Sequence, residues 1–225
     1  GIGELVRTLQ PALWAIFFLI PTGRGRIRDL VPPEIIESIL HWLYDYSRTA
    51  GFPIKTTAAP HFRRVATQRL LQDRRRGNGK TEIPDKRFFT KGTSADGIRL
   101  SRLAVNDGNG LCFISHTGEV YPSGFLPVSA GNVREKSLVE IYRNAPIFKQ
   151  LRDVSLLRGR CGICPFKKIC GGSRARAFAT TGDYLMDDPA CAYQPDCWNP
   201  TPSGDAKGVG IYSKITDPER HRSGG

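Results

Sequence analysis

Four cysteines in the last third of the chain have the spacing of a site for an inorganic cofactor. Cys161 and Cys164 form a C-x2-C pair, Cys170 follows after five residues, and Cys191 lies beyond a segment long enough for a helix. Two thiolates two residues apart can point at one metal centre from a tight turn, whereas the fourth sulfur must return through tertiary structure. Four sulfurs in this pattern can hold a tetrahedral Zn²⁺ or a [4Fe–4S] cluster.

The residues around these cysteines do not decide between the two cofactors. Glycines beside them would let the backbone bend closely around either one. A cluster held by four thiolates is anionic, so nearby cations would raise its potential, but a zinc ion held by four thiolates would gain from the same cations. The residues concerned are Gly162, Gly171, Gly172, Lys167, Lys168, Arg174 and Arg176.

Two further cysteines are expected to have no ligand role. Cys112 lies among apolar residues and is expected to be a buried small hydrophobe. Cys197 lies beside the C-terminal tail and is expected to be a spare thiol, with the alternative that it replaces Cys191 as a ligand. Six cysteines would also suit a disulfide framework, but such frameworks are typical of short chains with an export signal, and neither feature is recognised here. We therefore expect a reduced, metal-binding site in a cytoplasmic protein.

Length and composition favour a globular chain that neither crosses a membrane nor binds nucleic acid. The 225 residues are 40% hydrophobic, which is enough for one sizeable core or two small ones. The longest apolar run, Leu13–Ile20, is far shorter than the roughly 18 residues that a spanning helix needs. The formal net charge of +12 has no aromatic-interleaved binding motif with it, so we expect a solvated basic surface.

Residues 1–85 are expected to alternate strands and helices. The apolar run Leu13–Ile20 predicts a strand buried on both faces of a parallel sheet, with a buried helix as the alternative that periodicity leaves open. A turn that contains Gly23 and Gly25 follows it. The other predicted elements are an amphipathic helix from Pro32 to Tyr46, a short strand over Ile54–Thr57 and a helix that begins at Pro60.

The second half of the chain is expected to contain a separate small module. Residues 86–98 form a basic linker, residues 99–195 form the module, and residues 196–225 form a tail that we expect to be poorly ordered. A β-hairpin is predicted over 111–121, with its turn at Gly118, and helices are predicted after the N-cap residue Ser137 and over 146–151.

The cysteine segment and the residues before it resemble the SPASM/twitch region of radical SAM enzymes. The resemblance lies in the C-x2-C-x5-C pattern with its distant fourth cysteine and in the preceding segment GEVYPSGFLPVSAGNVREKSLVEIYRNAPIFKQLRD. The segment CGGSRARAFATTGDYLMDDPAC is similar to members that modify tetrapyrroles in the haem d1 and alternative haem pathways, and to uncharacterised relatives.

The resemblance covers residues 99–195 strongly and extends more weakly over 1–85, where it lies in FFLIPTGRG and IKTTAAPHFRRV. It implies a fold class of α/β, the end of a partial (β/α) barrel, followed by a small α+β SPASM/twitch module with a β-hairpin and a cysteine-ligated cluster loop.

The resemblance also implies one auxiliary [4Fe–4S] cluster where related enzymes hold two. The positions that ligate the second cluster match Cys161, Cys164, Cys170 and Cys191. Three positions that ligate the first cluster are occupied by Val105, Ser123 and Arg174, none of which we expect to be a ligand.

The chain contains no C-x3-C-x2-C triplet, the motif whose cluster binds S-adenosylmethionine in radical SAM enzymes. We therefore expect the C-terminal part of a longer enzyme, in which S-adenosylmethionine and a second [4Fe–4S] cluster bind elsewhere, and we expect this chain to be inactive alone. In the intact enzyme a 5′-deoxyadenosyl radical would abstract hydrogen from a tetrapyrrole or a peptide. The auxiliary cluster would then relay an electron or position the substrate, with a flavodoxin or ferredoxin as external electron donor.

Several residues have two interpretations, and no catalytic residue is assigned. Gly23 and Gly25 follow a predicted barrel strand and either approach S-adenosylmethionine or substrate, or only form the turn. His61 lines a substrate cavity or is structural. Arg174 and Arg176 bind an anionic substrate such as a porphyrin carboxylate, neutralise the cluster, or pair with Asp183, Asp187 or Asp188.

The alternative function is a structural zinc module that binds a protein or nucleic-acid partner through the basic surface of the chain.

Overall fold

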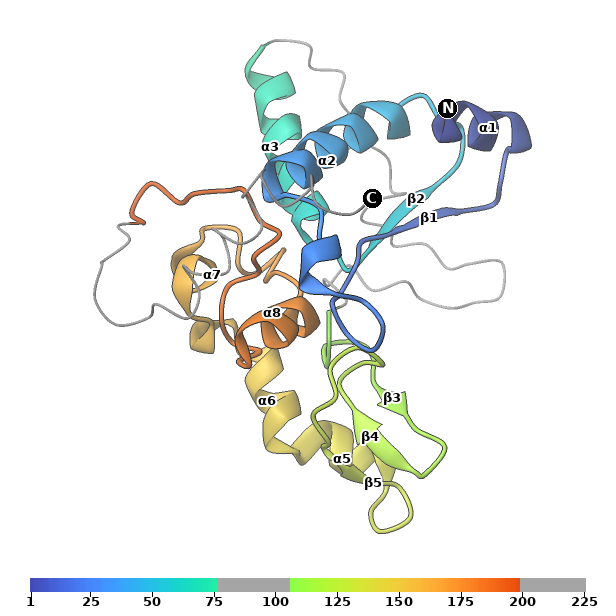
Figure 1. The fold of residues 1–225 in the computed structure, drawn as a ribbon. Coiled ribbons are helices and arrows are strands. Elements are labelled where there is room, and N and C mark those ends of the chain that lie inside the picture. The colour runs from blue at the N-terminus through green and yellow to red at the C-terminus, as the bar shows by residue number, and fades with distance from the viewer. Residues whose placement is uncertain (77–105, 199–225) are drawn as a thin grey trace, which may run out of the picture.

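The computed structural model describes residues 1–76 and 106–198, and the first range forms a parallel strand pair with helices (Figure 1). Strand β1 (Trp14–Phe17) pairs with β2 (Ile54–Thr57), and Trp14 lies opposite Ile54. The crossover between them contains the 3₁₀ helix η1 (Ile27–Asp29) and helix α2 (Pro33–Ser47). Helix α3 (His61–Arg75) follows β2, and α1 (Ile2–Leu9) precedes β1. Since parallel strands share an orientation, the carboxyl ends of β1 and β2 meet at one edge.

Apolar residues three or four positions apart build the core of this unit. Leu40 and Leu43 of α2 and Val65 of α3 are fully buried, and Trp14 and Ile16 of β1 pack against them. The predicted helix over 32–46 and the predicted strand over 54–57 are confirmed.

The prediction that Leu13–Ile20 is buried on both faces is wrong. Only Trp14–Phe17 is a strand, and Leu13 and Phe17 are each 50% exposed. The reason is that the described sheet here has two strands and that α2 and α3 cover one of its faces. On the other face Phe17 contacts the ring of Phe125, with 5.3 Å between centroids, but this contact does not bury it.

The second described range begins with a three-stranded antiparallel sheet. Its strands are β3 (Phe113–Ile114), β4 (Glu119–Tyr121) and β5 (Gly131–Asn132), in that order. Gly118 forms the β3–β4 turn with φ +90°, and a Cβ atom there would lie 2.6 Å from Asn132 Oδ1. A residue other than glycine at this position would therefore disrupt the sheet.

Two short helices pack on this sheet. Helix α5 (Leu138–Asn144) begins at Ser137, whose hydroxyl accepts a hydrogen bond from the Glu140 amide, and α6 (Pro146–Arg152) follows at once. Ile141 and Phe148 bury their side chains against Val120 of β4. The predicted N-cap and both predicted helices are confirmed.

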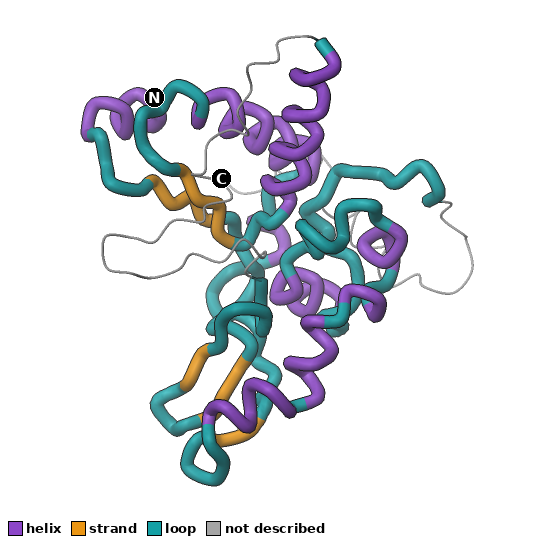
Figure 2. Tube along the Cα trace, turned by 180° about the vertical axis from the view of Figure 1, so that it is seen from behind, coloured by secondary structure: helices purple, strands orange, loops and turns teal. Residues whose placement is uncertain are grey.

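The cysteine segment lies beside both of these parts. It contains the 3₁₀ helix η2 (Val154–Leu156) and helices α7 (Gly159–Ile163) and α8 (Arg174–Thr181). Figures 1 and 2, which show opposite sides of the molecule, both place the parallel strand pair at one end and the three-stranded sheet at the other. Figure 1 places α8 beside the region where these two parts meet, with α7 farther out on the same side. The segment therefore contacts residues far away in the chain.

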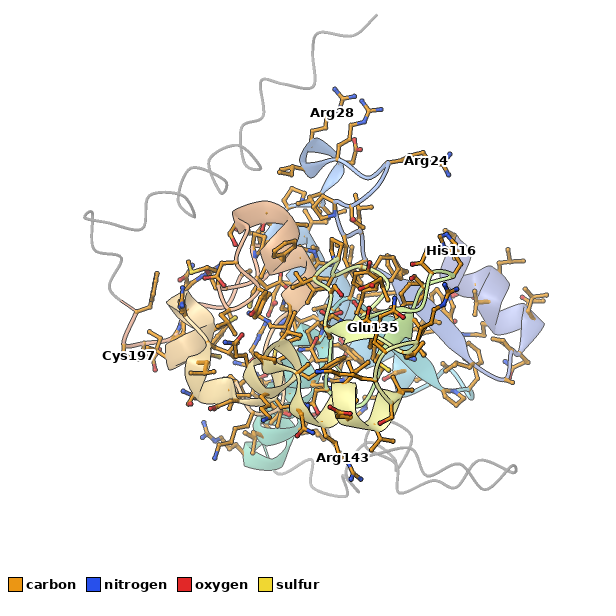
Figure 3. The ribbon with its side chains drawn as sticks, turned by 90° about the horizontal axis from the view of Figure 1, so that it is seen from below. Arg24, Arg28, His116, Glu135, Arg143 and Cys197 are labelled. Atoms are coloured by element: carbon orange, nitrogen blue, oxygen red, sulfur yellow. The ribbon has the colours of Figure 1, made fainter. Side chains whose placement is uncertain are left out.

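Several predictions concern residues outside the described ranges. The domain boundaries at 85 and 99, the basic linker 86–98, Val105 and the tail beyond residue 198 belong to this group. No helix within 1–76 or 106–198 is both long and apolar enough to cross a lipid bilayer. Charged side chains labelled in Figure 3, such as Arg24, Arg28 and Arg143, point away from the body of the molecule.

Candidate metal centre

The three cysteines of the C-x2-C-x5-C segment and the distant Cys191 line one pocket. Cys161 lies in α7, Cys164 caps its C-terminus, Cys170 precedes α8, and Cys191 lies where the chain returns after α8. All four thiols are free, so they are not joined as disulfides. The other lining residues are His61, Arg64, Arg160, Lys167, Gly171, Gly172, Asp187, Asp188, Tyr193 and Pro195.

A pair of glycines lets the backbone fold tightly against this pocket. Gly171 and Gly172 have φ values of +68° and +65°, and a Cβ atom on Gly172 would lie 3.2 Å from the sulfur of Cys161. The side-chain amide of Asn106 holds the same loop by donating to the Gly172 carbonyl at 2.8 Å. The space beside Cys161 therefore depends on the absence of a side chain at position 172.

Asp188 fixes the return of the chain toward Cys191. Its carboxylate is fully buried and accepts hydrogen bonds from the Ser173 amide at 2.7 Å and from Arg176 Nη1 at 3.0 Å. His61 Nε2 lies 3.1 Å from the same oxygen, Oδ2. Burial alone would raise the pKa of this carboxyl, but Arg176 and His61 together hold it well below its usual range. Asp188 is therefore ionised at neutral pH.

Two more cations lie against the cysteines. Arg160 pairs with Asp187 at 2.8 Å and donates to the Cys191 carbonyl at 2.9 Å. Arg174 Nη2 lies 3.7 Å from the sulfur of Cys161, and its Nη1 donates to the Tyr184 carbonyl at 2.9 Å. These guanidinium groups would stabilise negative charge on the sulfurs.

The structure shows what surrounds Arg174 and Arg176. Both side chains are buried, and Arg176 donates to the Leu19 and Ala58 carbonyls, just beyond the ends of β1 and β2, as well as to Asp188. Arg176 therefore joins α8 to the edge of the parallel strand pair, and Arg174 is the residue beside a cysteine sulfur. The contacts of the two guanidinium groups are with protein atoms, and they include the predicted pairing of Arg176 with Asp188.

Other predicted site residues lie elsewhere. Gly23 and Gly25 belong to the turn after β1, where the Gly25 amide donates to the Thr22 carbonyl at 3.0 Å, and neither lines the cysteine pocket. Ser123 is buried near β4, and its hydroxyl accepts from the Phe125 amide at 3.3 Å. Cys112 is only partly buried, and Cys197 is exposed at the edge of the described chain (Figure 3).

His61 and Arg64 are the pocket residues supplied by a distant element. His61, which was expected to line a substrate cavity or to be structural, is buried, lies 3.1 Å from Asp188 Oδ2 and borders the cysteines. Arg64 has no motif of its own. The sequence does contain a signal that could have revealed Arg64. His61 and Arg64 are basic residues three positions apart, and they lie beside Val65 on the helix face that the apolar pattern predicts to be buried.

Burial raises the pKa of three of the four cysteine thiols. The pKa of Cys191 rises to about 12, and those of Cys161 and Cys170 are also raised. For Cys191 the charge of Arg64 opposes the effect of burial. Metal binding at these residues must therefore displace protons, as thiolate ligation requires.

We expect iodoacetamide to modify Cys197 of the metal-free protein at pH 8 far faster than Cys191. A thiol with a pKa of about 12 is ionised in about one molecule in ten thousand at that pH, and Cys191 is also less exposed than Cys197. Peptide mass spectrometry after timed labelling measures both rates, and labelling in urea provides the fully accessible reference. Equal rates in the folded protein would contradict the burial described above.

The four thiols line one pocket together with buried cations. Within 1–76 and 106–198, no group of three or more Cys, His, Asp or Glu side chains is arranged to hold a single metal ion. Four thiols, a glycine pair and several buried cations match what a thiolate-bound, anionic iron–sulfur cluster needs.

Comparison with known proteins gives a consistent result. Residues 106–171 match the SPASM family, described as an iron-sulfur cluster-binding domain. The chain is 42% identical over 192 residues to an AdoMet-dependent heme synthase of Methanosarcina barkeri, a match that covers 85% of this chain and 51% of that protein. The chain thus spans about half the length of this curated relative.

Two shorter matches involve other enzymes. A PqqA peptide cyclase of Methylocella silvestris is 36% identical over 88 residues, covering 37% of this chain and 24% of that protein. A pre-heme d1 synthase of Dinoroseobacter shibae is 35% identical over 88 residues, covering 37% of this chain and 22% of that protein. These relatives are radical SAM enzymes of the SPASM type.

Proposed function

Because this chain carries a SPASM domain and is a homologue of radical SAM enzymes along most of its length, we propose that it is the C-terminal portion of a radical SAM oxidoreductase with one auxiliary [4Fe–4S] cluster. The observation that carries the proposal is the convergence of four free thiols on one pocket, three of them within or beside the matched domain.

In this proposal Cys161, Cys164, Cys170 and Cys191 hold the cluster. A cluster bound there would exchange single electrons with a substrate radical or help to position the substrate. The protein contributes buried surroundings that limit water, and guanidinium groups that offset negative charge on the sulfurs.

The extent of the matches favours a tetrapyrrole over a peptide as substrate. The heme synthase of M. barkeri matches 85% of the chain, whereas the peptide cyclase matches 37%. A substrate contacts more of an enzyme than its cluster loop, so similarity across both parts of the chain is the better guide to substrate class. A flavodoxin or ferredoxin is the electron donor that we propose for the intact enzyme.

Cleavage of S-adenosylmethionine is proposed to need residues that this sequence does not contain. No C-x3-C-x2-C triplet occurs in the 225 residues. The reconstituted chain, incubated anaerobically with S-adenosylmethionine and dithionite, is therefore expected to form no 5′-deoxyadenosine. Its formation would refute this part of the proposal.

Metal analysis of the anaerobically reconstituted chain tests the cluster itself. We expect about four iron and four sulfide per chain, a brown colour, and an electron paramagnetic resonance signal after reduction. The competing zinc module predicts one zinc, no sulfide and no colour. When iron, sulfide and zinc are supplied together in the reconstitution, the cluster and the zinc ion compete for the four cysteines in one sample.

A further inference from the structure

A buried arginine of α3 presents one nitrogen without a partner beside the cysteine pocket. The side chain of Arg64 is 2% exposed and lines the pocket, and its Nε has no hydrogen-bond partner among the described residues. Buried donors without partners are rare, because each has given up its hydrogen bonds to water. Such an atom at the border of a cofactor pocket points to a partner supplied by the cofactor.

The remainder of the Arg64 guanidinium is firmly held. Nη1 donates to Glu37 of α2 and to Gln68, each at 2.8 Å, and Nη2 donates to the second Glu37 oxygen. The ring of Tyr193 lies 5.0 Å from the guanidinium carbon. Burial alone would raise the pKa of Glu37, but the hydrogen bond and charge of Arg64 outweigh it and lower that pKa. The orientation of Nε is therefore set by protein contacts alone.

The positive charge of Arg64 also acts on two of the cysteine thiols. Its charge opposes the rise that burial causes in the pKa of the Cys191 thiol, and it does the same at Cys170. His61, one turn earlier on α3, borders the same pocket and has an unpartnered Nδ1. Arg64 is the stronger donor, because its Nε always carries a hydrogen, whereas His61 Nδ1 donates in only some of its forms.

We propose that Arg64 Nε donates a hydrogen bond to a sulfur atom of the auxiliary cluster and so raises the reduction potential of that cluster. This inference rests on the proposed function, because it requires a cluster on the four cysteines. A hydrogen bond and a positive charge at the sulfurs favour the more anionic, reduced state. Arg64 is thereby a positioning and tuning residue, and takes no part in bond making.

The consequence is that the cluster depends on both parts of the chain. The four cysteines lie after residue 160, whereas Arg64 and its anchor Glu37 belong to α3 and α2 of the parallel unit. The potential of the cluster is then set correctly only when α3 is packed against the cysteine segment. The proposed cluster therefore has its full set of hydrogen-bond donors only when the parallel strand pair and its helices are folded beside it.

Redox titration of the Arg64→Gln variant tests the inference. At a fixed solution potential we expect the ratio of reduced to oxidised cluster to fall about tenfold, which is about 59 mV for a one-electron couple. The control is Arg69→Gln on the same helix, which removes the same charge from a residue that pairs with Asp45 and does not line the pocket. We expect no shift in the control.

A second measurement uses the unaltered protein. Pulsed electron paramagnetic resonance of the reduced cluster in ¹⁵N-arginine-labelled protein should detect coupling to arginine nitrogens, one of them from Arg174, whose Nη2 lies 3.7 Å from the sulfur of Cys161. Arg64→Lys, which keeps a charge but lacks Nε, should remove one of these couplings and leave the Arg174 coupling in place. This pair of samples decides the matter even if Arg64→Gln binds no cluster.

Equal potentials in Arg64→Gln and Arg69→Gln at equal iron content would overturn the inference, as would spectra of the labelled protein that Arg64→Lys leaves unchanged. Absence of any [4Fe–4S] cluster from the unaltered protein would instead overturn the proposed function. The two failures are thus distinguishable.

Discussion

Replacing any one of Cys161, Cys164, Cys170 or Cys191 with alanine is expected to abolish assembly of an intact cluster. The reconstituted protein should fall from about four iron per chain to near zero, or to a three-iron form that lacks the iron of the missing ligand. The reason is that each thiol lines the same pocket, and within the described chain no fifth cysteine does. Iron and sulfide content and visible absorbance measure the outcome.

Cys197→Ala and Cys112→Ala are the matched controls for this experiment. Both remove a free thiol from the same chain, but Cys197 is exposed and Cys112 packs beside the three-stranded sheet. Both variants should keep full iron content. Retention of four iron by Cys191→Ala, combined with loss in Cys197→Ala, would show that Cys197 is the fourth ligand.

Asp188→Asn is expected to cause the largest loss of stability of any single polar substitution proposed here. The variant leaves the buried Arg176 guanidinium without its counter-charge and places an amide against the Ser173 N–H. Removing one partner of a buried ion pair costs about 3–5 kcal/mol. Thermal or urea unfolding followed by circular dichroism measures the change.

Asp183→Asn serves as the control for Asp188→Asn. Asp183 pairs with Arg158 at 2.8 Å, but the Arg158 side chain is 62% exposed, and an exposed pair contributes about 0–1 kcal/mol. Asparagine can also keep the hydrogen bond that Asp183 accepts from the Leu185 amide. Equal destabilisation in the two variants would contradict the role given to Asp188.

The ionisation of Asp188 also predicts how the free energy of unfolding depends on pH. Because the pKa of Asp188 is depressed in the folded protein, its stabilising contribution is present above the pKa of the unfolded chain, about 3.9, and is lost as pH falls below it. The free energy of unfolding of the unaltered protein should therefore approach that of Asp188→Asn between about pH 5 and pH 2. A difference that stays constant over this range would argue against an ionised Asp188.

Local sequence was a sound guide wherever the structure depends on neighbouring residues. The helix over 33–47, the strand over 54–57 and the Ser137 cap follow from residue spacing and hydrogen-bonding groups within one turn. The grouping of Cys161, Cys164 and Cys170 around one loop is local in the same sense, since only nine positions separate the first from the last.

Tertiary structure decided which faces are covered and which charges meet. The exposure of Phe17 reflects the incomplete cover over that face of β1, which residue type does not encode. The roles of Arg174, Arg176 and Arg64 depended on which carbonyl, carboxylate or thiol lay beside each guanidinium once the chain had folded. Spacing along the chain controls backbone geometry over a few residues, whereas the surroundings of a long charged side chain are set by packing of segments distant in sequence. The sequence by itself therefore identified four cysteines and the elements around them, and only the fold brought α3 to the pocket that they line.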